Sequence, residues 1–390
     1  MSAALLPDVT RICESVVLVG TFPPTECGIA TYTANLRDGL ETCGIDSRVL
    51  RIVDDTEVGS DTVHVVGHWV RTRPRGAAAA AALVSPFDSV LVQHEFGIYP
   101  GVDGAEVVPF VEMCRPPVFT VLHTVLDTPT SSQHRIIDAL LQSSELVVVH
   151  TAVAAARLIR VHEVPASRVA IVPHGATSNL NGPRPLRSVE PIMLTWGLLG
   201  PGKGIERGIE AVAQMRSAGL DVRYVVAGET HPKVLLREGE RYRESLHELA
   251  RERGVADLVD FDGCYRSWDS LRAIVRSADV VLVPYDTRDQ ITSGVLVEAL
   301  AAGKPVVATA FPHAIELGPT GAVTVVDHES PDEVASSVTA ILTDQSLRAA
   351  MQAAARVESA HYDWPTVGER FHHLMTGQLQ NVSPRRNLAS

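Results

Sequence analysis

Short apolar runs alternate with helical patterns along nearly the whole chain, and this alternation restricts the possible folds more than any other feature. Strands are expected at 15–20, 47–52, 62–66, 89–92, 118–122, 146–149 and 169–172, and again at 192–195, 222–227, 258–261, 280–283, 306–309 and 322–325. Helical patterns occupy 29–42, 105–113, 133–142, 152–161, 205–217, 241–253, 270–276, 295–302, 331–342, 346–358 and 365–375. Strand–helix–strand alternation is typical of parallel sheets with helices on both faces. The sequence therefore predicts an α/β protein.

Two separate cores are expected, because 390 residues exceed what one ordinary core holds. The stretch 176–187 is poor in apolar residues and rich in Asn, Pro and Gly, which indicates an interdomain linker. We therefore predict a first domain over 1–178, a second over 190–360, and a flexible tail at 379–390.

Charge and cysteine content narrow the class of function. A formal net charge of −12 and a pI near 5.7 argue against a nucleic-acid partner, and no helix carries a dense basic face for an anionic membrane. The five cysteines are scattered and never spaced as CxxC, which predicts a reducing compartment and no structural zinc. No apolar run approaches the roughly 18 residues of a membrane span. We expect a soluble cytoplasmic protein without stable membrane insertion; its oligomeric state stays open.

The segment 289–305 places a carboxylate on a short apolar helix. A polar loop turns at Ser293-Gly294 into this helix, Glu298 is its one acid, and Gly303 and Pro305 end it. The unpaired N–H groups and positive dipole end of a helix start suit an anion. The alternative is a buried crossover helix whose Glu298 is satisfied by a neighbouring backbone group.

A second glycine-rich loop follows the first strand of the second half. Gly-Pro-Gly-Lys-Gly at 200–204 places Lys203 at a helix start, which suits a phosphate through point charge and backbone donors. Its spacing is not that of a Walker A loop, and a plain surface turn is the alternative. The loop at 21–28 also contains glycine but lacks GxGxxG, so a nicotinamide site is not expected.

Histidines follow the predicted strands of the first half. His94, His123 and His174 each come at or just after a strand end. Ligands of open parallel sheets bind at that edge, so three histidines there predict a polar cleft. A single histidine of this kind is more often a helix cap or a satisfied loop residue.

Together these features resemble GT-B glycosyltransferases, and more narrowly the retaining family 4 (glycosyl transferase group 1). The matching motifs are Pro-Pro…Gly at 23–28, His-Gly at 174–175, Glu-Ala-Leu-Ala-Ala-Gly-Lys-Pro-Val-Val at 298–307 and Tyr-Asp-Trp at 362–364. The resemblance implies two doubly wound Rossmann-like domains facing each other across a cleft. It assigns acceptor binding to the first domain, completed by a C-terminal helix at 361–378, and nucleotide-sugar donor binding to the second.

The resemblance also implies residue roles. Lys203 would hold the donor pyrophosphate, Glu298 would accept hydrogen bonds from the ribose, and His123 would lie beside the donor sugar. The implied catalytic residues are His123, Lys203, Gln290 and Glu298. The implied donor-binding residues are Gly28, Gly202, Lys203, Gly228, Cys264, Tyr265, Ser293, Gly294, Val295, Leu296 and Glu298. No metal ligand is implied.

Two positions depart from the family pattern. The first acid of Glu-x7-Glu is Gln290, and the arginine expected after Gly197 is Leu198. A glutamine still forms hydrogen bonds with sugar hydroxyls, whereas a lost guanidinium removes charge stabilisation from the leaving group. Arg207 or the Thr230-His231 pair are candidate substitutes. The sequence resembles a subgroup that combines Gly-Leu-Leu…Gly-Lys-Gly, Thr-His-Pro and Asp-Gln-x-x-Ser-Gly.

The implied activity is that of a hexosyltransferase in polysaccharide biosynthesis. It would move a hexose from a nucleotide sugar to a hydroxyl of a soluble saccharide with retention, the leaving phosphate oxygen assisting deprotonation of the acceptor. Family frequency favours mannose from GDP-mannose, with UDP-glucose next, and no divalent metal is required. The alternatives are a nucleotide-sugar epimerase of the same fold and a non-catalytic nucleotide-sugar-binding protein.

Overall fold

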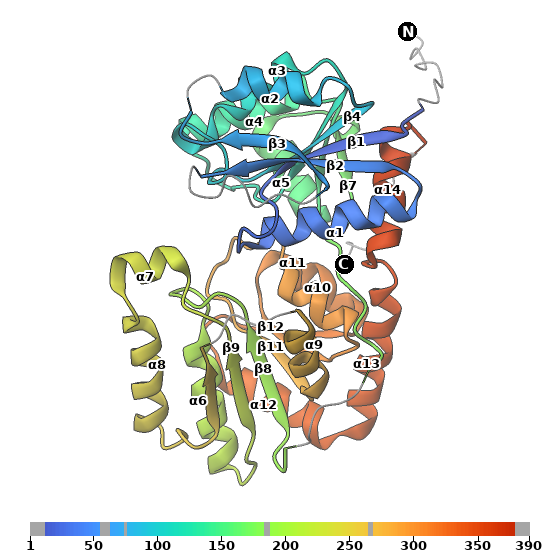
Figure 1. The fold of residues 1–390 in the computed structure, drawn as a ribbon. Coiled ribbons are helices and arrows are strands. Elements are labelled where there is room, and N and C mark those ends of the chain that lie inside the picture. The colour runs from blue at the N-terminus through green and yellow to red at the C-terminus, as the bar shows by residue number, and fades with distance from the viewer. Residues whose placement is uncertain (1–11, 55–62, 74–75, 183–187, 264–267, 379–390) are drawn as a thin grey trace. The chain divides into compact units, whose positions relative to one another are not determined.

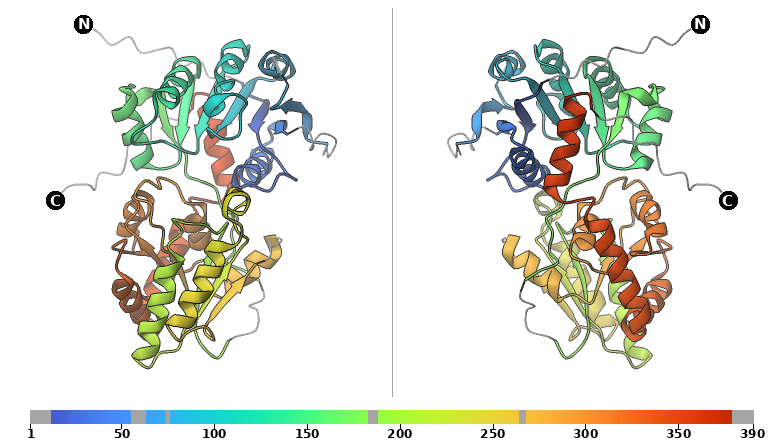
Figure 2. Two further views of the ribbon diagram at one scale, coloured as in Figure 1. Left: turned by 90° about the vertical axis from the view of Figure 1, so that its left-hand side faces the viewer. Right: turned by 90° about the vertical axis from the view of Figure 1, so that its right-hand side faces the viewer.

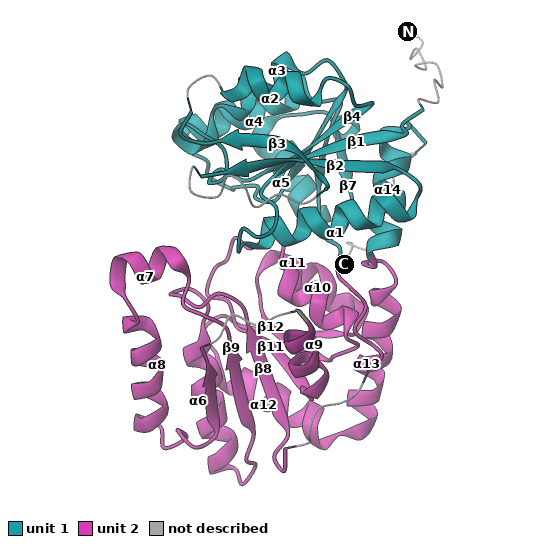
Figure 3. Ribbon diagram, viewed as in Figure 1, with its two compact units in different colours: residues 1–175, 364–390 teal, residues 176–363 magenta. Residues whose placement is uncertain are grey.

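The chain divides into two compact units, each built around one sheet. The computed structural model describes residues 12–54, 63–73, 76–182, 188–263 and 268–378, so the expected tail at 379–390 lies outside it. Unit 1 comprises residues 1–175 and 364–390, and unit 2 comprises residues 176–363 (Figure 3). The paired strands within each sheet are all parallel, which confirms the predicted α/β class.

Unit 1 contains a seven-stranded sheet in the order β3-β2-β1-β4-β5-β6-β7 (Figure 1). Its strands are β1 (Ser15–Gly20), β2 (Asp46–Val53), β3 (Val65–Val70), β4 (Ser89–His94), β5 (Val118–Leu122), β6 (Leu146–Val149) and β7 (Val169–Ile171). Its helices are α1 (Gly28–Thr42), α2 (Gly76–Val84), α3 (Val107–Met113), α4 (Ser131–Ser143), α5 (Ala152–His162) and α14 (Trp364–Met375), with short 3-10 turns η2 (Val102–Gly104) and η3 (Ala166–Arg168). The strand order reverses between β1 and β4.

Helix α14 packs into unit 1 although unit 2 separates it from the rest of that unit in sequence. It lies against α1, where a Cβ on Gly368 would stand 2.5 Å from the carbonyl carbon of Gly39. Two facing glycines therefore let the helix backbones approach closely. Phe371 of α14 and Leu36 of α1 are fully buried in the same core cluster.

Unit 2 contains a six-stranded sheet in the order β10-β9-β8-β11-β12-β13. Its strands are β8 (Ile192–Trp196), β9 (Arg223–Ala227), β10 (Val259–Asp262), β11 (Val280–Val283), β12 (Val306–Thr309) and β13 (Val323–Val326). Its helices are α6 (Ile205–Ser217), α7 (Pro232–Glu238), α8 (Arg241–Glu252), α9 (Trp268–Ser277), α10 (Gly294–Ala301), α11 (Pro312–Leu317), α12 (Pro331–Thr343) and α13 (Gln345–Ser359), with the 3-10 turn η4 (Gly318–Thr320). Side views show helices on both faces of each sheet (Figure 2).

Some elements differ from the expectations. Helix α2 was not predicted because its run of alanines carries no amphipathic pattern. Helices α7 and α11 were not predicted either; they are short, and each begins with a proline. The strand expected at 62–66 begins at Val65, and residue 62 lies outside the described part. The predicted linker at 176–187 begins within unit 2, where the Asn179 N–H donates to the Ala301 carbonyl at 3.0 Å.

No helix among the described residues has the length and apolar character to cross a bilayer.

Candidate active site

The order of the unit 2 sheet reverses between β8 and β11, and ligands of doubly wound sheets bind outside the strand ends at such a point. Two loops leave the sheet here, 197–204 after β8 and 284–293 after β11. They touch each other. The Asp286 N–H donates to the Gly202 carbonyl at 3.0 Å, and the Lys203 ammonium lies 4.5 Å from the ring centroid of Tyr285. The lysine expected to meet a phosphate therefore belongs to this edge.

Two glycines make this close approach of loops possible. Gly204 has φ +64°, and a Cβ there would stand 1.8 Å from the Pro284 carbonyl oxygen. Gly228 has φ +141°, and its Cβ would stand 2.1 Å from the Gly197 carbonyl oxygen. Any larger residue would push the loops apart. Gly202, by contrast, has open space around its Cβ position.

The start of α10 presents free backbone donors at the same edge. Ser293 caps the helix, its Oγ accepting from the Leu296 N–H at 3.3 Å. The Ser293 N–H in turn donates to Nδ1 of buried His313 at 3.0 Å, which anchors the loop. Within the described residues, no hydrogen bond occupies the N–H of Gly294 or Val295. These two amides are the ones that a ligand phosphate can use.

Glu298 lies one turn further along α10 and is held by a side chain of the neighbouring strand. The Trp196 indole N–H, at the end of β8, donates to Glu298 Oε2 at 3.1 Å. Burial raises the pKa of Glu298 to about 7, while this hydrogen bond and the charge of Arg272 oppose the rise. The carboxyl group is thus close to half ionised at neutral pH, where a hydroxyl donor would favour its charged form. Within the described residues, no backbone group forms a hydrogen bond with the Glu298 carboxyl group.

Gln290 shapes its own loop. Its Nε2 donates to the Thr292 carbonyl, and the Gln290 carbonyl accepts from the His313 N–H at 3.4 Å. The buried Thr292 hydroxyl has no partner within the described residues. Cys264 and Tyr265, expected to contact the base, lie outside the described residues.

Arg207, one candidate for the missing arginine, is already engaged. Its Nη2 lies 3.0 Å from Asp286 Oδ1, and its Nε donates to the His328 carbonyl. Its guanidinium braces the loop that follows β11. We therefore assign Arg207 a structural role: it holds the loop after β11 in place.

Positive charge gathers instead around the start of α7. His231 caps this helix by accepting the Lys233 N–H at Nδ1, 3.1 Å away. Burial lowers the pKa of His231, and the charges of Lys233, Lys203 and Arg237 lower it further. Lys203, in the loop after β8, and Lys233 and Arg237, on α7, are thus all close enough to His231 to act on its charge.

In unit 1, four consecutive strands each lead to a histidine at their carboxyl ends. His94 is the last residue of β4, and His123, His150 and His174 come after β5, β6 and β7. The ring centroids of His123 and His150 are 5.1 Å apart, and those of His150 and His174 are 5.4 Å apart. Sequence reasoning missed His150, because Val-Val-Val-His-Thr at 147–151 reads as a strand followed by a helix cap.

Tyr32 of α1 sits against this histidine cluster. Its ring lies 4.8 Å from His123, 5.3 Å from His150, 5.0 Å from His174 and 5.2 Å from Trp364 between centroids. Its buried hydroxyl has no hydrogen-bond partner within the described residues. A helical tyrosine gives no sequence signal for such a position, since its pattern is that of a core residue.

Burial disfavours the charged form of three histidines of this cluster, His94, His123 and His174. Burial lowers the pKa of His94 to about 3 and that of His174 to about 4. Burial also holds the pKa of His123 well below its usual value, helped by the charges of His150, His174 and His94. His123 Nε2 lies 2.9 Å from Gln93 Oε1. A neutral imidazole both donates and accepts hydrogen bonds, as a sugar hydroxyl does.

Comparison with known proteins fits this geometry. Residues 180–358 match the family described as glycosyl transferases group 1. Unit 2 belongs to this family. The glycosyl transferases group 1 segment thus contains the candidate donor residues Lys203, Gly228, Gln290 and Glu298 and the start of α10.

Three curated relatives show the range of proteins that this chain resembles. It is 27% identical over 226 residues to the lipopolysaccharide 1,2-N-acetylglucosaminetransferase of Salmonella typhimurium, covering 54% of this chain and 57% of that protein. It is 30% identical over 266 residues to the D-inositol 3-phosphate glycosyltransferase of Corynebacterium diphtheriae, covering 64% and 60%. It is 30% identical over 232 residues to the GDP-mannose-dependent alpha-(1-6)-phosphatidylinositol monomannoside mannosyltransferase of Mycobacterium tuberculosis, covering 55% and 57%. These matches span less than two thirds of each relative.

Solved structures establish the fold. Anabaena Alr3699/HepE, solved with UDP and glucose, superposes with a TM-score of 0.77 at 17% identity, covering 93% of this chain and all (100%) of that one. WaaG, a glycosyltransferase of lipopolysaccharide biosynthesis, superposes with a TM-score of 0.63 at 18% identity, covering 93% and 100%. The fold is therefore GT-B, as the sequence predicts.

Proposed function

We propose that this protein transfers a hexose from a nucleotide sugar to a hydroxyl of a saccharide, with retention of anomeric configuration. One observation carries the proposal. At the point where the unit 2 sheet reverses, the Lys203 ammonium, the free amides at the start of α10 and the Glu298 carboxyl group belong to loops and helices that touch one another. A cation, two N–H donors and a carboxylate suit a diphosphate joined to a ribose.

The donor contacts are assigned as follows. Lys203 and the amides of Gly294 and Val295 bind the diphosphate and stabilise its charge as the sugar departs. Glu298 accepts hydrogen bonds from ribose hydroxyls. The arginine that the family pattern places at Leu198 is replaced by the charges of Lys233 and Arg237, which lie close enough to lower the pKa of His231 together with Lys203.

In the proposed transfer step, the protein positions the two reactants and supplies no amino-acid nucleophile. We assign His123 to a hydroxyl of the donor sugar, because its neutral ring donates from Nε2 to Gln93 Oε1 and leaves Nδ1 to accept from that hydroxyl. The leaving phosphate oxygen takes the proton of the acceptor hydroxyl on the same face of the sugar. Aligning the two reactants lowers the barrier by several kcal/mol.

GDP-mannose is our first choice of donor, and a soluble saccharide our first choice of acceptor. The mycobacterial relative named as a GDP-mannose-dependent mannosyltransferase supports the donor. UDP-glucose is second, supported by the structural neighbour solved with UDP-glucose at a TM-score of 0.75. The net charge of −12 supports an acceptor that is not embedded in an anionic membrane.

A ligand screen tests the proposal. Thermal shifts are measured with GDP, UDP and ADP, followed by turnover of the matching sugar nucleotides with a panel of acceptors. A nucleotide at 100 times its dissociation constant stabilises the native state by about 2.7 kcal/mol. Lys203→Ala should abolish most of that shift, whereas the matched control Arg251→Ala, an exposed cation on α8, should retain it.

The other readings predict different results. Conversion of the donor sugar without acceptor would identify an epimerase, and binding without any turnover would identify a non-catalytic binding protein. The absence of a shift with every nucleotide at millimolar concentration would remove the proposed site altogether.

A further inference from the structure

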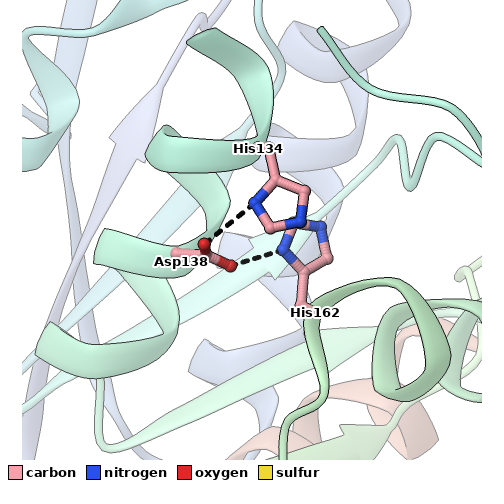
Figure 4. A group of neighbouring side chains, drawn as sticks. All are labelled: His134, Asp138 and His162. Atoms are coloured by element: carbon pink, nitrogen blue, oxygen red, sulfur yellow. Dashed lines mark hydrogen bonds and ion pairs between the residues drawn. The ribbon is translucent and has the colours of Figure 1, made fainter. Parts of the chain in front are cut away.

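A compact group of two histidines and one aspartate lies in unit 1, apart from the residues assigned above. His134 and Asp138 stand one turn apart on α4, and His162 is the last residue of α5 (Figure 4). The three point toward one another: His134 Nδ1 lies 2.9 Å from Asp138 Oδ2, and His162 Nδ1 lies 2.6 Å from Asp138 Oδ1. The two imidazole ring centroids are 4.4 Å apart.

Hydrogen bonds alone do not suit both ring nitrogens of His134. His134 faces two acceptors, since its Nδ1 meets the Asp138 carboxylate and its Nε2 lies 3.3 Å from the Val161 carbonyl oxygen. A neutral imidazole has one N–H and can satisfy only one of them. A cation between His134 Nδ1 and the carboxylate would leave the one N–H of His134 to the Val161 carbonyl.

We propose that His134, Asp138 and His162 bind a divalent transition-metal ion, with zinc as the preferred ion. One atom from each residue is available, and these atoms all lie within 4.8 Å of one another. Two imidazole nitrogens and one carboxylate oxygen form a ligand set that zinc accepts in proteins. At metal–ligand distances of 2.0–2.1 Å, tetrahedral ligands stand about 3.3 Å apart. The two contacts with Asp138 would lengthen by less than about 1 Å, and the imidazole nitrogens, which lie within 4.8 Å of each other, would close by up to about 1.5 Å.

The surroundings of the three side chains suit a metal ligand set. With Nδ1 as the ligand atom, His134 Nε2–H is free to donate to the Val161 carbonyl, the kind of second contact that orients metal-binding histidines. The His162 side chain is only 2% exposed and so is held in place, whereas His134 is 40% and Asp138 36% exposed. The ion can enter from solvent, and a water molecule can fill the fourth position.

A bound ion would join two helices that the chain otherwise connects through β6. It would link the first turns of α4 to the final residue of α5, directly before Glu163, which adopts a left-handed φ of 50°. We therefore assign the ion a stabilising role in unit 1. The group shares no residue with the proposed donor contacts, so this inference does not depend on glycosyl transfer.

Zinc binding to the full chain, prepared without a histidine tag and freed of metal with EDTA, tests the inference. Calorimetry with zinc chloride should show one equivalent bound, and the melting temperature should rise with zinc concentration. Cobalt(II) should give the visible absorption of a tetrahedral complex. His162→Gln, Asp138→Asn and His134→Gln should each weaken binding at least about tenfold. The control His247→Gln, an exposed histidine on α8, should leave it unchanged.

Two results would overturn the inference. One is the absence of any zinc-dependent shift in the wild-type chain, which would mean that the three side chains bind only one another. The other is wild-type affinity in all three ligand variants, which would place the zinc elsewhere, for example at a free cysteine such as Cys43. His134→Gln alters a partly exposed side chain, so this variant keeps the test valid even if His162→Gln fails to fold.

Discussion

The hydrogen bond from Trp196 to Glu298 should control the pH dependence of donor binding. Replacing Trp196 by Phe keeps an aromatic ring at the end of β8 but removes the indole N–H that donates to Glu298 Oε2 at 3.1 Å. That bond stabilises the carboxylate form, against the burial that raises the pKa to about 7. Without it, Glu298 should be protonated at neutral pH, and a neutral carboxyl oxygen accepts weaker hydrogen bonds from a ribose than a carboxylate does.

The size of the effect follows from the strength of the bond. A hydrogen bond to a charged group is worth about 1.5–3 kcal/mol, and 1.36 kcal/mol corresponds to one pH unit of pKa. The pKa of Glu298 should therefore move from about 7 to about 8 or 9. The carboxylate fraction at pH 7 then falls from about one half to between about one tenth and one hundredth, which sets an upper limit of roughly 5- to 50-fold on the loss of nucleotide affinity.

Calorimetric titration of the best-bound nucleotide at pH 7 and pH 9 measures this effect. The affinity of Trp196→Phe, relative to wild type, should be low at pH 7 and should largely recover at pH 9. Glu298→Gln is the control, because the phosphate of the nucleotide still titrates in it while residue 298 no longer does. Thermal unfolding of each variant without ligand reports any loss of packing.

One result would refute this reasoning. If Trp196→Phe lowered affinity by the same factor at pH 7 and pH 9, the loss would come from packing around the smaller ring. The ionisation of Glu298 would then have no part in donor binding.

Three further predictions concern stability. In denaturant titrations, Gly204→Ala should destabilise the protein by more than about 2 kcal/mol, because its Cβ would stand 1.8 Å from the Pro284 carbonyl oxygen. The control Gly28→Ala, whose Cβ would have no atom within 4 Å, should change stability by less than about 0.5 kcal/mol. Lys304→Met should cost about 2 kcal/mol, because Lys304 Nζ donates to two carbonyls at 2.8 and 2.7 Å, yet nucleotide affinity should stay unchanged. His94→Phe should make the protein less sensitive to acid. The pKa of His94 is about 3 in the folded protein and that of an ordinary histidine after unfolding, so the unfolded chain binds the proton first as the pH falls. This lowers the free energy of unfolding of the wild type by about 2 kcal/mol at pH 5. Equal losses of melting temperature between pH 7.5 and pH 5 in both proteins would contradict that sign.

Most helices and strands could be predicted from the sequence because the patterns that indicate them are local. Strands such as β1 and β12 are short apolar runs between turn residues, and helices such as α6 begin after a glycine loop, as predicted. Elements without a local signal were missed or displaced. The alanine run of α2 has no polar face to set a period.

The candidate site could be predicted only in part, because only some of its residues have a local sequence pattern. Lys203 and Glu298 stand out because each is a charge in a glycine-rich or apolar setting. Their partners do not, since Trp196 at a strand end has the pattern of a core residue and Asp286 that of an ordinary loop acid. The group of His134, Asp138 and His162 has no local sequence signal, because His162 is 24 residues from Asp138. Contacts between distant segments depend on packing that no local pattern records.

The return of the chain into unit 1 has a consequence for synthesis on the ribosome. The two crossings between the units run together: the Ala176 N–H donates to the Tyr362 carbonyl at 2.7 Å, and Gly175 packs directly against the Trp364 indole. Unit 2 is complete once residue 363 has emerged, but the core of unit 1 lacks Val367 and Phe371 until α14 follows. The domain that begins the sequence is thus the last to close, and its incomplete core must stay soluble while the whole of unit 2 is translated.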